Sequence, residues 1–179
     1  MKLKFSTLLA SFLWLCVAVG MQAQVKFERG RLYTIRPAST KAQVWSGGER
    51  GQAVVLARTD SRAAGQQWTV AALSGSYRLI NPFSGLVAHA TADRRVAMTE
   101  NNGSDESQLW LIEPSGKASL LVPANSPTLA ARMKADGTVE LIDKAKARTD
   151  RAAQFLFEPS PVAGFDVNAT YRIEALGTD

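Results

Sequence analysis

Short apolar or alternating segments follow one another along this chain every 8 to 12 residues or so, separated by turn residues. The breaks include Ser46-Gly47-Gly48, Asn101-Asn102-Gly103 and Asp136-Gly137, whose residues accept a positive φ or close local side-chain turns. No long stretch has the periodicity of an amphipathic helix. The pattern is typical of all-β sandwiches and barrels and predicts twelve strands. They are residues 32–36, 42–45, 53–57, 66–70, 77–80, 86–90, 96–98, 108–112, 118–122, 128–133, 138–142 and 154–157.

These strands group into three similar units of roughly forty residues, four strands to a unit. Each unit closes on an aromatic residue, and the three aromatics Trp68, Trp110 and Phe155 are spaced by 42 and 45 residues. After the aromatic, the second and third units also share two apolar residues followed by Glu-Pro. Because one unit cannot bury its apolar face alone, we expect the three to close around a shared core, with these rings as buried counterparts.

The closing segments resemble the Gln-x-Trp hallmark of the ricin-type β-trefoil lectin domain. Gln66-Gln67-Trp68 and Gln108-Leu109-Trp110 match it in full, whereas the third copy reads Ala153-Gln154-Phe155. The segment Asn81-Pro82-Phe83-Ser84-Gly85-Leu86 also looks like the family's turn between the first and second strands. We expect Gln66 and Gln108 to lie on the strand of their tryptophan and to cap local backbone groups, which is a structural role.

This resemblance, which covers about residues 28–159, implies an all-β chain folded as a β-trefoil, with three four-stranded repeats and pseudo-threefold symmetry. The expected domain runs over residues 24–160, with repeats of about 28–72, 73–115 and 116–159.

Lectins of this family hold a sugar with an aspartate just after the first turn, an aromatic platform and an asparagine near the closing motif. This chain has neither a carboxylate nor an aromatic ring at the positions that align with them, so the usual galactose pocket cannot be assembled. The second repeat keeps the most polar residues, so the candidate ligand-binding residues are His89, Asn101, Asn102 and Gln108. Aligned on the turns, the aspartate position holds Val44, His89 and Ala131, and the platform position falls near Ala57, Thr99 and Ile142.

Trp45 breaks the repeat, because neither other unit carries a ring at its position. One interpretation makes it a replacement sugar platform and adds it to the candidate ligand-binding residues. The other makes it a filler of the core or of an interface.

Catalytic and metal chemistry find little support in the sequence. His89 is the only histidine, so it cannot build a multi-histidine metal site, and no Gly-x-Ser-x-Gly elbow accompanies it. His89 is either a ligand-orienting side chain or a partly exposed histidine without a special role. The acidic pair Glu113 and Glu158 lies at equivalent positions of two repeats, where threefold symmetry keeps the two apart. We therefore expect no enzyme, no catalytic residue, no metal and no cofactor.

The first 23 residues have the pattern of an export signal, with Lys2 and Lys4 before the apolar run Leu8–Val19 and a small residue, Ala23, at the expected cut. A membrane anchor is the alternative, but the run is shorter than the roughly 20 residues that a bilayer requires. Cleavage removes the only cysteine, Cys16, so no disulfide or thiolate remains. We expect a secreted, periplasmic or cell-surface bacterial protein that does not insert into the membrane.

Cleavage also leaves 19 basic against 16 acidic residues, a net charge of +3. The basic residues are scattered along the chain rather than concentrated on one segment, which does not indicate nucleic acid as a partner.

Residues 161–179 contain a segment whose spacing matches the beginning of the first repeat. Phe165–Ile173 repeats the spacing of Phe27–Ile35 at an offset of 138 residues, about one whole trefoil. The tail is then either a linker followed by the first strand of a second, truncated domain or a final strand that clamps the edge of the first. We favour the former, because an unpaired apolar strand is normally covered.

Two functions remain open. The first, for which the family resemblance is the only support, is an exported noncatalytic carbohydrate-binding module, accessory to a glycan-active enzyme. The second is a β-trefoil scaffold that binds or inhibits another protein through its loops and binds no sugar.

Overall fold

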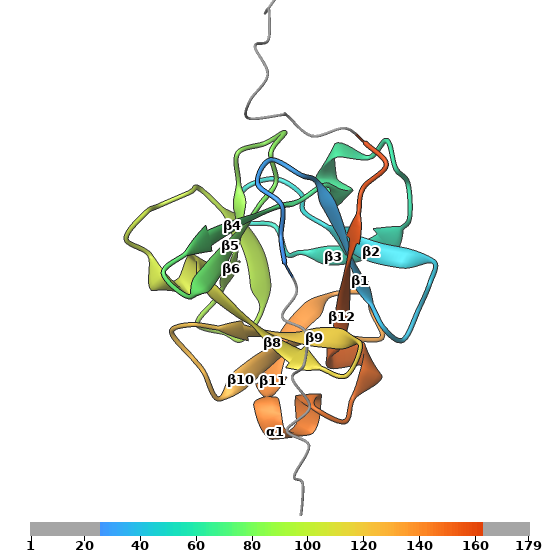
Figure 1. Ribbon diagram of the computed structural model, residues 1–179. Coiled ribbons are helices and arrows are strands. Elements are labelled where there is room, and N and C mark those ends of the chain that lie inside the picture. The colour runs from blue at the N-terminus through green and yellow to red at the C-terminus, as the bar shows by residue number, and fades with distance from the viewer. Residues whose placement is uncertain (1–25, 163–179) are drawn as a thin grey trace, which may run out of the picture.

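The computed structural model of the chain describes residues 26–162. The expected signal segment 1–23 lies outside the described residues, and so do residues 163–179 of the segment 161–179 that was expected to hold a linker and the first strand of a second domain. Within them, three lobes of antiparallel strands surround a common centre (Figure 1). The first repeat contains β1 (Tyr33–Pro37), β2 (Gln43–Ser46), β3 (Val55–Arg58) and β4 (Thr69–Leu73). The second contains β5 (Ser76–Ile80), β6 (Val87–Ala90), β7 (Val96–Thr99) and β8 (Trp110–Ser115), and the third β9 (Ala118–Pro123), β10 (Leu129–Met133), β11 (Val139–Asp143) and β12 (Phe155–Pro159).

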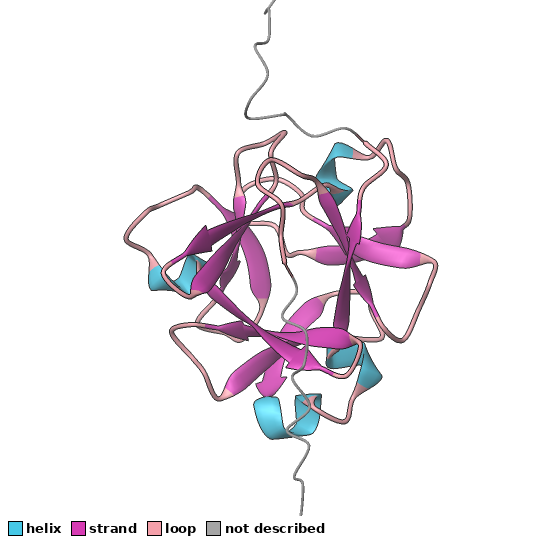
Figure 2. Ribbon diagram, in the orientation of Figure 1, coloured by secondary structure: helices cyan, strands magenta, loops and turns pink. Residues whose placement is uncertain are grey.

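The last two strands of each repeat are separated by a single 3₁₀ turn: η1 (Ala64–Gln66), η2 (Glu106–Gln108) and η3 (Arg151–Ala153). The third repeat also has the short helix α1 (Lys144–Ala147), and Figure 2 shows how little helix the described chain contains. The twelve strands expected from the sequence are present, and most of their ends agree to within one to three residues.

The first and last strands of the three repeats form a closed barrel. β1 pairs with β12, β12 with β9, β9 with β8, β8 with β5, and β5 with β4. The ring closes where the amide of Tyr33 donates to the carbonyl of Trp68 at 2.8 Å and the amide of Trp68 donates back at 2.9 Å. Tyr77 pairs with Trp110 and Ser119 with Phe155 in the same way, so each closing aromatic pairs with the first strand of its own repeat.

The inner strands of the repeats form three hairpins, β2–β3, β6–β7 and β10–β11, that together cap the barrel. Single bridges join each hairpin to the next: Ala53 to Ala97, Arg95 to Glu140, and Thr138 to Val55. The three bridges have the same register. Ala53, Arg95 and Thr138 are equivalent residues before or at the start of the second strand of their hairpins, and each pairs with the residue that lies two positions after its equivalent in another hairpin. They therefore fix which residues of the three repeats are equivalent.

The three closing aromatics are fully buried in one apolar cluster, as the sequence predicted. The indole N–H of Trp68 donates to the carbonyl of Trp45 at 3.3 Å, and that of Trp110 donates to the carbonyl of Ala88 at 2.9 Å. Phe155 has no N–H to donate, so the third repeat lacks this link. The β-trefoil fold is confirmed.

The motif glutamines lie in 3₁₀ turns and not on the strand of their tryptophan, which corrects one expectation. Their capping role is present. The Oε1 of Gln108 accepts the amide of Asn102 at 2.9 Å and its Nε2 donates to the carbonyl of Glu100 at 2.8 Å. Gln66 binds the amide of Asp60 and the carbonyl of Arg58 in the same manner, both at 2.8 Å. Each glutamine thus supports the loop that leads into its closing strand.

The third repeat replaces this support with apolar packing. Ala153, at the glutamine position, is fully buried in a cluster with Ala147 of α1, Leu120 and Val122. The helix occupies the loop that Gln66 and Gln108 hold open in the other repeats, and Asp143 caps it by accepting the amide of Ala145 at 2.9 Å. A buried alanine needs no hydrogen-bond partner, which explains why the motif can degenerate here.

Trp45 is fully buried in the core cluster, which confirms the interpretation of this ring as a core filler and corrects the sugar-platform interpretation. Its ring lies 5.2 Å from the ring of Phe155 and 6.2 Å from that of Trp68, at 72° to each. The equivalent residues of the other repeats are Ala88 and Ala131, both fully buried. One large ring therefore fills the centre that two small residues and the smaller ring of Phe155 leave open.

Candidate functional site

The polar residues that the sequence singled out in the second repeat are largely engaged with the protein itself. Gln108 is 1% exposed with both ends of its amide bonded, so it cannot contact a ligand, and its candidate role in binding is corrected. The Oδ1 of Asn101 accepts from the guanidinium of Arg78 at 3.0 Å. The Oδ1 of Asn102 accepts the amide of Ser104 at 3.2 Å. Both asparagines thus shape their own loop, although their side chains are exposed.

Arg78 organises this loop from beneath. It is 6% exposed, and besides Asn101 it donates to the carbonyl of Asn102 at 3.1 Å and to that of Gly103 at 3.4 Å. The structure describes no carboxylate paired with it. Carbonyl oxygens therefore replace a counter-ion here, and the buried charge makes the loop conformation a requirement of the fold.

His89 lies half-buried on β6. Burial lowers the pKa of its imidazole, and the nearby carboxylate of Asp105 opposes this by attraction. Hydrogen bonds from Ser107 hold the pKa of Asp105 below its usual value, with a smaller contribution from His89. His89 is therefore a neutral imidazole at pH 7, able to donate and to accept.

The register of the hairpins corrects the alignment of the repeats. Val55, Ala97 and Glu140 are the equivalent residues that receive the three bridges, and they pair with Ser46, His89 and Arg132 respectively. The residues equivalent to His89 are therefore Ser46 and Arg132, and not Val44 and Ala131, which are buried. The one position of this set with a strongly charged side chain is Arg132, in the third repeat.

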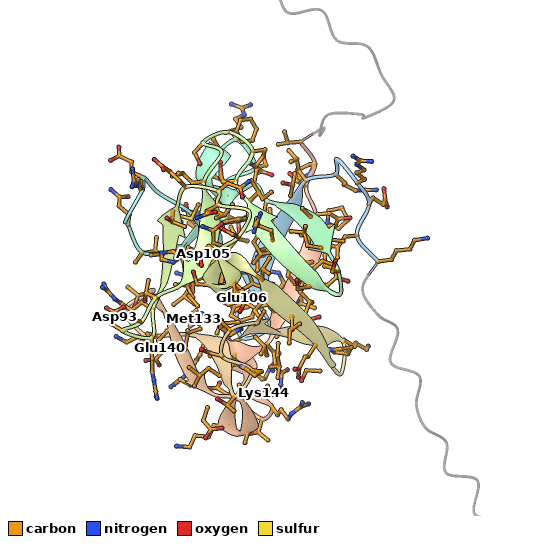
Figure 3. All side chains as sticks on the ribbon, turned by 90° about the vertical axis from the view of Figure 1, so that its left-hand side faces the viewer. Asp93, Asp105, Glu106, Met133, Glu140 and Lys144 are labelled. Atoms are coloured by element: carbon orange, nitrogen blue, oxygen red, sulfur yellow. The ribbon has the colours of Figure 1, made fainter. Side chains whose placement is uncertain are left out.

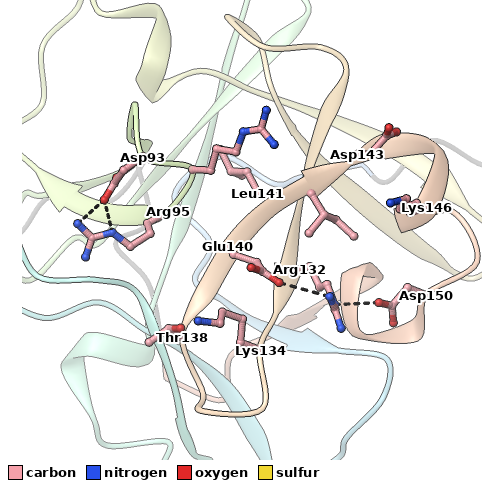
Figure 4. Close-up of a pocket in the computed structure, with 12 residues that line it drawn as sticks. Asp93, Arg95, Arg132, Lys134, Thr138, Glu140, Leu141, Asp143, Lys146 and Asp150 are labelled. Carbon is pink, nitrogen blue, oxygen red and sulfur yellow. Dashed lines mark hydrogen bonds and ion pairs between the residues drawn. The ribbon is translucent and has the colours of Figure 1, made fainter.

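A groove opens around Arg132, between the turn of the β6–β7 hairpin and the β10–β11 hairpin with α1 (Figure 4). We call it the third-repeat groove; its volume is about 840 Å³, within the range of ligand sites. Figure 3 shows Asp93 and Glu140 on the same side of the molecule, from the two hairpins that border it. Its lining residues are Asp93, Arg94, Arg95, Arg132, Lys134, Thr138, Glu140, Leu141, Ile142, Asp143, Lys146 and Asp150.

Two carboxylates hold Arg132 in the middle of the groove. Its Nη1 lies 3.3 Å from Oε1 of Glu140, and its Nε lies 2.9 Å from Oδ2 of Asp150 (Figure 4). Asp150 also accepts the amide of Ala152 at 2.8 Å, and this capping contact fixes the carboxylate. The result is a preorganised row of negative, positive and negative groups that is still partly exposed, with side-chain exposures of 31%, 41% and 33%.

The opposite wall is the hairpin turn of the second repeat. Hydrogen bonds from Thr91 and Arg95 hold the pKa of Asp93 below its usual value, so its carboxylate is charged at neutral pH. Arg94 has a φ of 60°, in the left-handed region that non-glycine residues rarely adopt, whereas the equivalent residue of the third repeat is Gly137, with a φ of 85°. The carbonyl of Arg94 accepts the amide of Leu141 at 2.8 Å, which ties this wall to the other. Among the described residues, Arg94 and Lys146 form no ion pair.

Sequence reasoning missed Arg132, Glu140 and Asp150. Arg132 and Glu140 are visible as charges facing outward on two strands, but only the cross-strand register places them opposite each other. Asp150 lies beyond α1, in the part of the third repeat that departs from the motif. The charge of Arg132 is the signal that could have identified the site. It becomes visible when the alignment with His89 is shifted by one residue in the third repeat, from Ala131 to Arg132, and by two in the first, from Val44 to Ser46.

In residues 26–162, three or more histidine, cysteine or acidic side chains do not gather into a possible metal site. Nor does that part of the chain contain a helix with the length and apolar character to cross a membrane.

Comparison with known proteins agrees with this architecture. A family model described as a ricin-type β-trefoil lectin domain-like domain matches residues 64–142. None of the curated proteins matches the sequence.

Solved structures are similar in fold at low sequence identity. One is a GlcNAcα1-4Gal-releasing endo-β-galactosidase from Clostridium perfringens, with a TM-score of 0.65, 15% identity and coverage of 72% of this chain and 32% of that one. Another is a lectin from Polyporus squamosus bound to a Neu5Acα2-6Galβ1-4GlcNAc epitope, with a TM-score of 0.61, 13% identity and coverage of 74% and 50%. The designed threefold-symmetric protein ThreeFoil has a TM-score of 0.62 at 17% identity, with 71% and 97% covered.

This chain thus spans about a third of the endo-β-galactosidase, and the likeness to these structures establishes the fold. Together with the match of the family model, it confirms the resemblance that the Gln-x-Trp motifs indicated. The chain therefore resembles ricin-type β-trefoil lectin-like domains over residues 64–142, within a β-trefoil that extends over the described chain.

Proposed function

We propose that this chain is an exported, noncatalytic carbohydrate-binding module that holds a glycan in the third-repeat groove. The observation that supports this most directly is the guanidinium of Arg132, fixed between Glu140 and Asp150 and still partly exposed. The lectin-like match and the lectin among the structural neighbours support a sugar as the ligand class. The galactosidase among the neighbours favours an accessory role beside a glycan-active enzyme.

The groove suits a ligand rich in hydroxyl groups. Neighbouring hydroxyls can donate to the carboxylates of Glu140 and Asp150 while accepting from Arg132, and charge-assisted bonds of this kind are short and directional. Leu141 and Ile142 give part of the lining an apolar character, against which the C–H groups of a pyranose can lie. The twelve lining residues include no aromatic ring, so we expect weak binding of single sugars.

The test is a glycan array probed with the full mature chain, followed by titration calorimetry on the strongest ligand. R132Q and E140Q each remove one charge of the row while keeping a polar side chain, and E140Q also keeps the side-chain length. Each should weaken binding at least tenfold, because a hydrogen bond to a charged group contributes about 1.5–3 kcal/mol. R31A is the matched control, since it removes an exposed arginine that pairs with Glu28 at 2.8 Å and lies outside the groove.

One observation favours the alternative, a scaffold that binds or inhibits another protein. The groove is lined mostly by charged side chains and lacks a stacking ring, which also suits a charged protein loop. An array on which the chain binds no glycan would remove the lectin proposal and leave this one. Glycan binding that survives both R132Q and E140Q would instead place the sugar elsewhere on the trefoil.

A further inference from the structure

We infer that the trefoil has a second sugar-binding site, separate from the third-repeat groove, in which the apolar face of a hexopyranose stacks on Phe83. Phe83 is 58% exposed, which is unusual because most of the other aromatic rings in residues 26–162 are buried. It borders a pocket of about 380 Å³ with Ser61, Arg62, Ala64, Gln67, Pro161 and Val162. Neither pocket shares a lining residue with the other.

The ring stands on a turn that the fold holds rigidly. Asn81 is 2% exposed, and its Oδ1 accepts the amides of Phe83 and Ser84 at 3.1 and 3.0 Å. Its Nδ2 donates to the carbonyls of Ala64 and Gln67 at 2.8 and 3.2 Å. Asn81 thus joins the turn that bears Phe83 directly to the 3₁₀ turn that forms the other side of the pocket. Little conformational entropy remains to be lost there when a ligand stacks.

The pocket also contains a buried acceptor without a donor. Gln67 is 1% exposed, and its Nε2 donates to the carbonyl of Ser61 at 3.3 Å. Its Oε1 has no hydrogen-bond partner among the described residues. Buried amide oxygens are nearly always paired, so an unpaired one in the lining of a pocket points to a group that enters from outside. A hydroxyl of the ligand is such a group.

These features together identify a sugar more closely than an apolar ligand. A pyranose has one apolar face of C–H groups and a rim of hydroxyls. Phe83 offers the stacking surface, Gln67 offers an acceptor, and Ser61 and Arg62 offer donors at the rim. A purely apolar ligand would leave the oxygen of Gln67 unpaired. Because the third-repeat groove has no ring, the two sites differ in chemistry, and a long glycan that reaches both would gain in avidity.

The inference rests on the proposed carbohydrate-binding function, and NMR separates the two sites. We would titrate the ¹⁵N-labelled full mature chain with three probes: methyl β-D-galactopyranoside, methyl β-D-glucopyranoside and methyl α-D-mannopyranoside. At least one probe should shift the amide of Phe83 and the side-chain amide of Gln67, which reports directly on its Oε1. F83A should abolish these shifts and F83W should retain them. L73A is the matched control, because Leu73 is an exposed apolar residue, 41% accessible, outside the pocket.

Each result decides the matter. Shifts around Phe83 that F83A removes and R132Q leaves intact support the second site. Shifts confined to Arg132 and its neighbours overturn the Phe83 site and support the third-repeat groove. Shifts confined to the surroundings of Phe83 support the Phe83 site and overturn the groove. No shift with any of the three probes, or shifts that persist in F83A, overturn the second site. So would cross-relaxation between Phe83 and residues 163–179 in the free chain, because the pocket would then be occupied by the protein itself.

Discussion

Trp45 and Phe155, which lie 110 positions apart in the sequence, pack with their ring centres 5.2 Å apart at 72°. Each breaks the symmetry of the repeats: Trp45 is larger than its equivalents Ala88 and Ala131, and Phe155 is smaller than its equivalents, which are tryptophans. Their contact at the centre of the trefoil indicates that the two departures compensate each other.

This compensation gives a test by double mutation. W45A restores the alanine of the other two repeats but leaves a cavity beside Phe155, and should cost about 3–5 kcal/mol of unfolding free energy. F155W alone should cost about 1–3 kcal/mol, because Trp45 already occupies the space. In the double variant the new ring fills the cavity and its N–H can reach the carbonyl of Ala131, the equivalent of Ala88. Urea denaturation should show W45A/F155W to be more stable than W45A.

W45F is the control, since it keeps most of the ring and removes a buried N–H that has no partner in the described structure. It should change stability far less than W45A. Strictly additive effects of W45A and F155W would mean that the two residues do not compensate.

The loop before the closing strand is supported by a glutamine in the second repeat and by a buried alanine in the third, so we expect neither residue to be replaceable by the other. Q108A should destabilise the chain by about 1–3 kcal/mol, because the amide of Asn102 and the carbonyl of Glu100 lose a shared partner. A153Q should also destabilise, because it forces an amide between Ala147 and the core. Q154A, a change at an exposed hydrogen bond in the same motif, should stay within about 0.5 kcal/mol by thermal unfolding. A stable A153Q variant would show that the helix yields to the motif.

The turn of the third hairpin predicts a pH effect. The hydroxyl of Thr138 donates to Oδ1 of Asp136 at 2.6 Å, and this bond, with the Thr138 amide and Lys134, lowers the pKa of that carboxyl to about 2 from 3.8. Because the folded pKa lies below the unfolded one, the contribution of Asp136 to stability is complete above pH 3.8 and is lost as the pH falls towards 2. T138V should move the pKa of Asp136 back towards 3.8, measured by NMR titration of the side-chain carboxyl.

T138S, which keeps the hydroxyl, should behave like the natural chain. If T138V leaves the pKa unchanged, Lys134 and the backbone amide are sufficient to hold the charge.

Replacing Arg94 by glycine should have opposite effects on stability and on glycan binding. Its φ of 60° suits glycine, so R94G should leave the chain as stable or more stable by up to about 1 kcal/mol. The same change removes an arginine from the third-repeat groove and should weaken glycan binding there. S74G, at the other non-glycine residue with positive φ in the described part of the chain, of 44°, should raise stability without touching the groove. R94G that binds as tightly as the natural chain would exclude Arg94 from the site.

The fold could be predicted from the sequence because large aromatic residues recur once in each repeat. Trp68, Trp110 and Phe155 recur at nearly constant spacing, and short apolar or alternating segments lie between them. The sequence left the burial of Trp45 as one of two interpretations, because the space for its ring depends on the volume of Phe155, in another repeat. The position of the groove depends on bridges such as Arg95 to Glu140, which join segments far apart in the chain. A one-residue difference in the aligned register exchanges the buried Ala131 for the outward Arg132.

β1 and β12 are hydrogen-bonded neighbours over their whole lengths, from Tyr33 opposite Pro159 to Pro37 opposite Phe155. The entry and the exit of the trefoil therefore lie side by side, and a host chain could receive this module in a surface loop without being spread apart. The same adjacency permits circular permutation: residues 26 and 162 joined by a short linker, with new ends at the Ser74–Gly75 turn, would preserve each barrel pairing while reordering the chain.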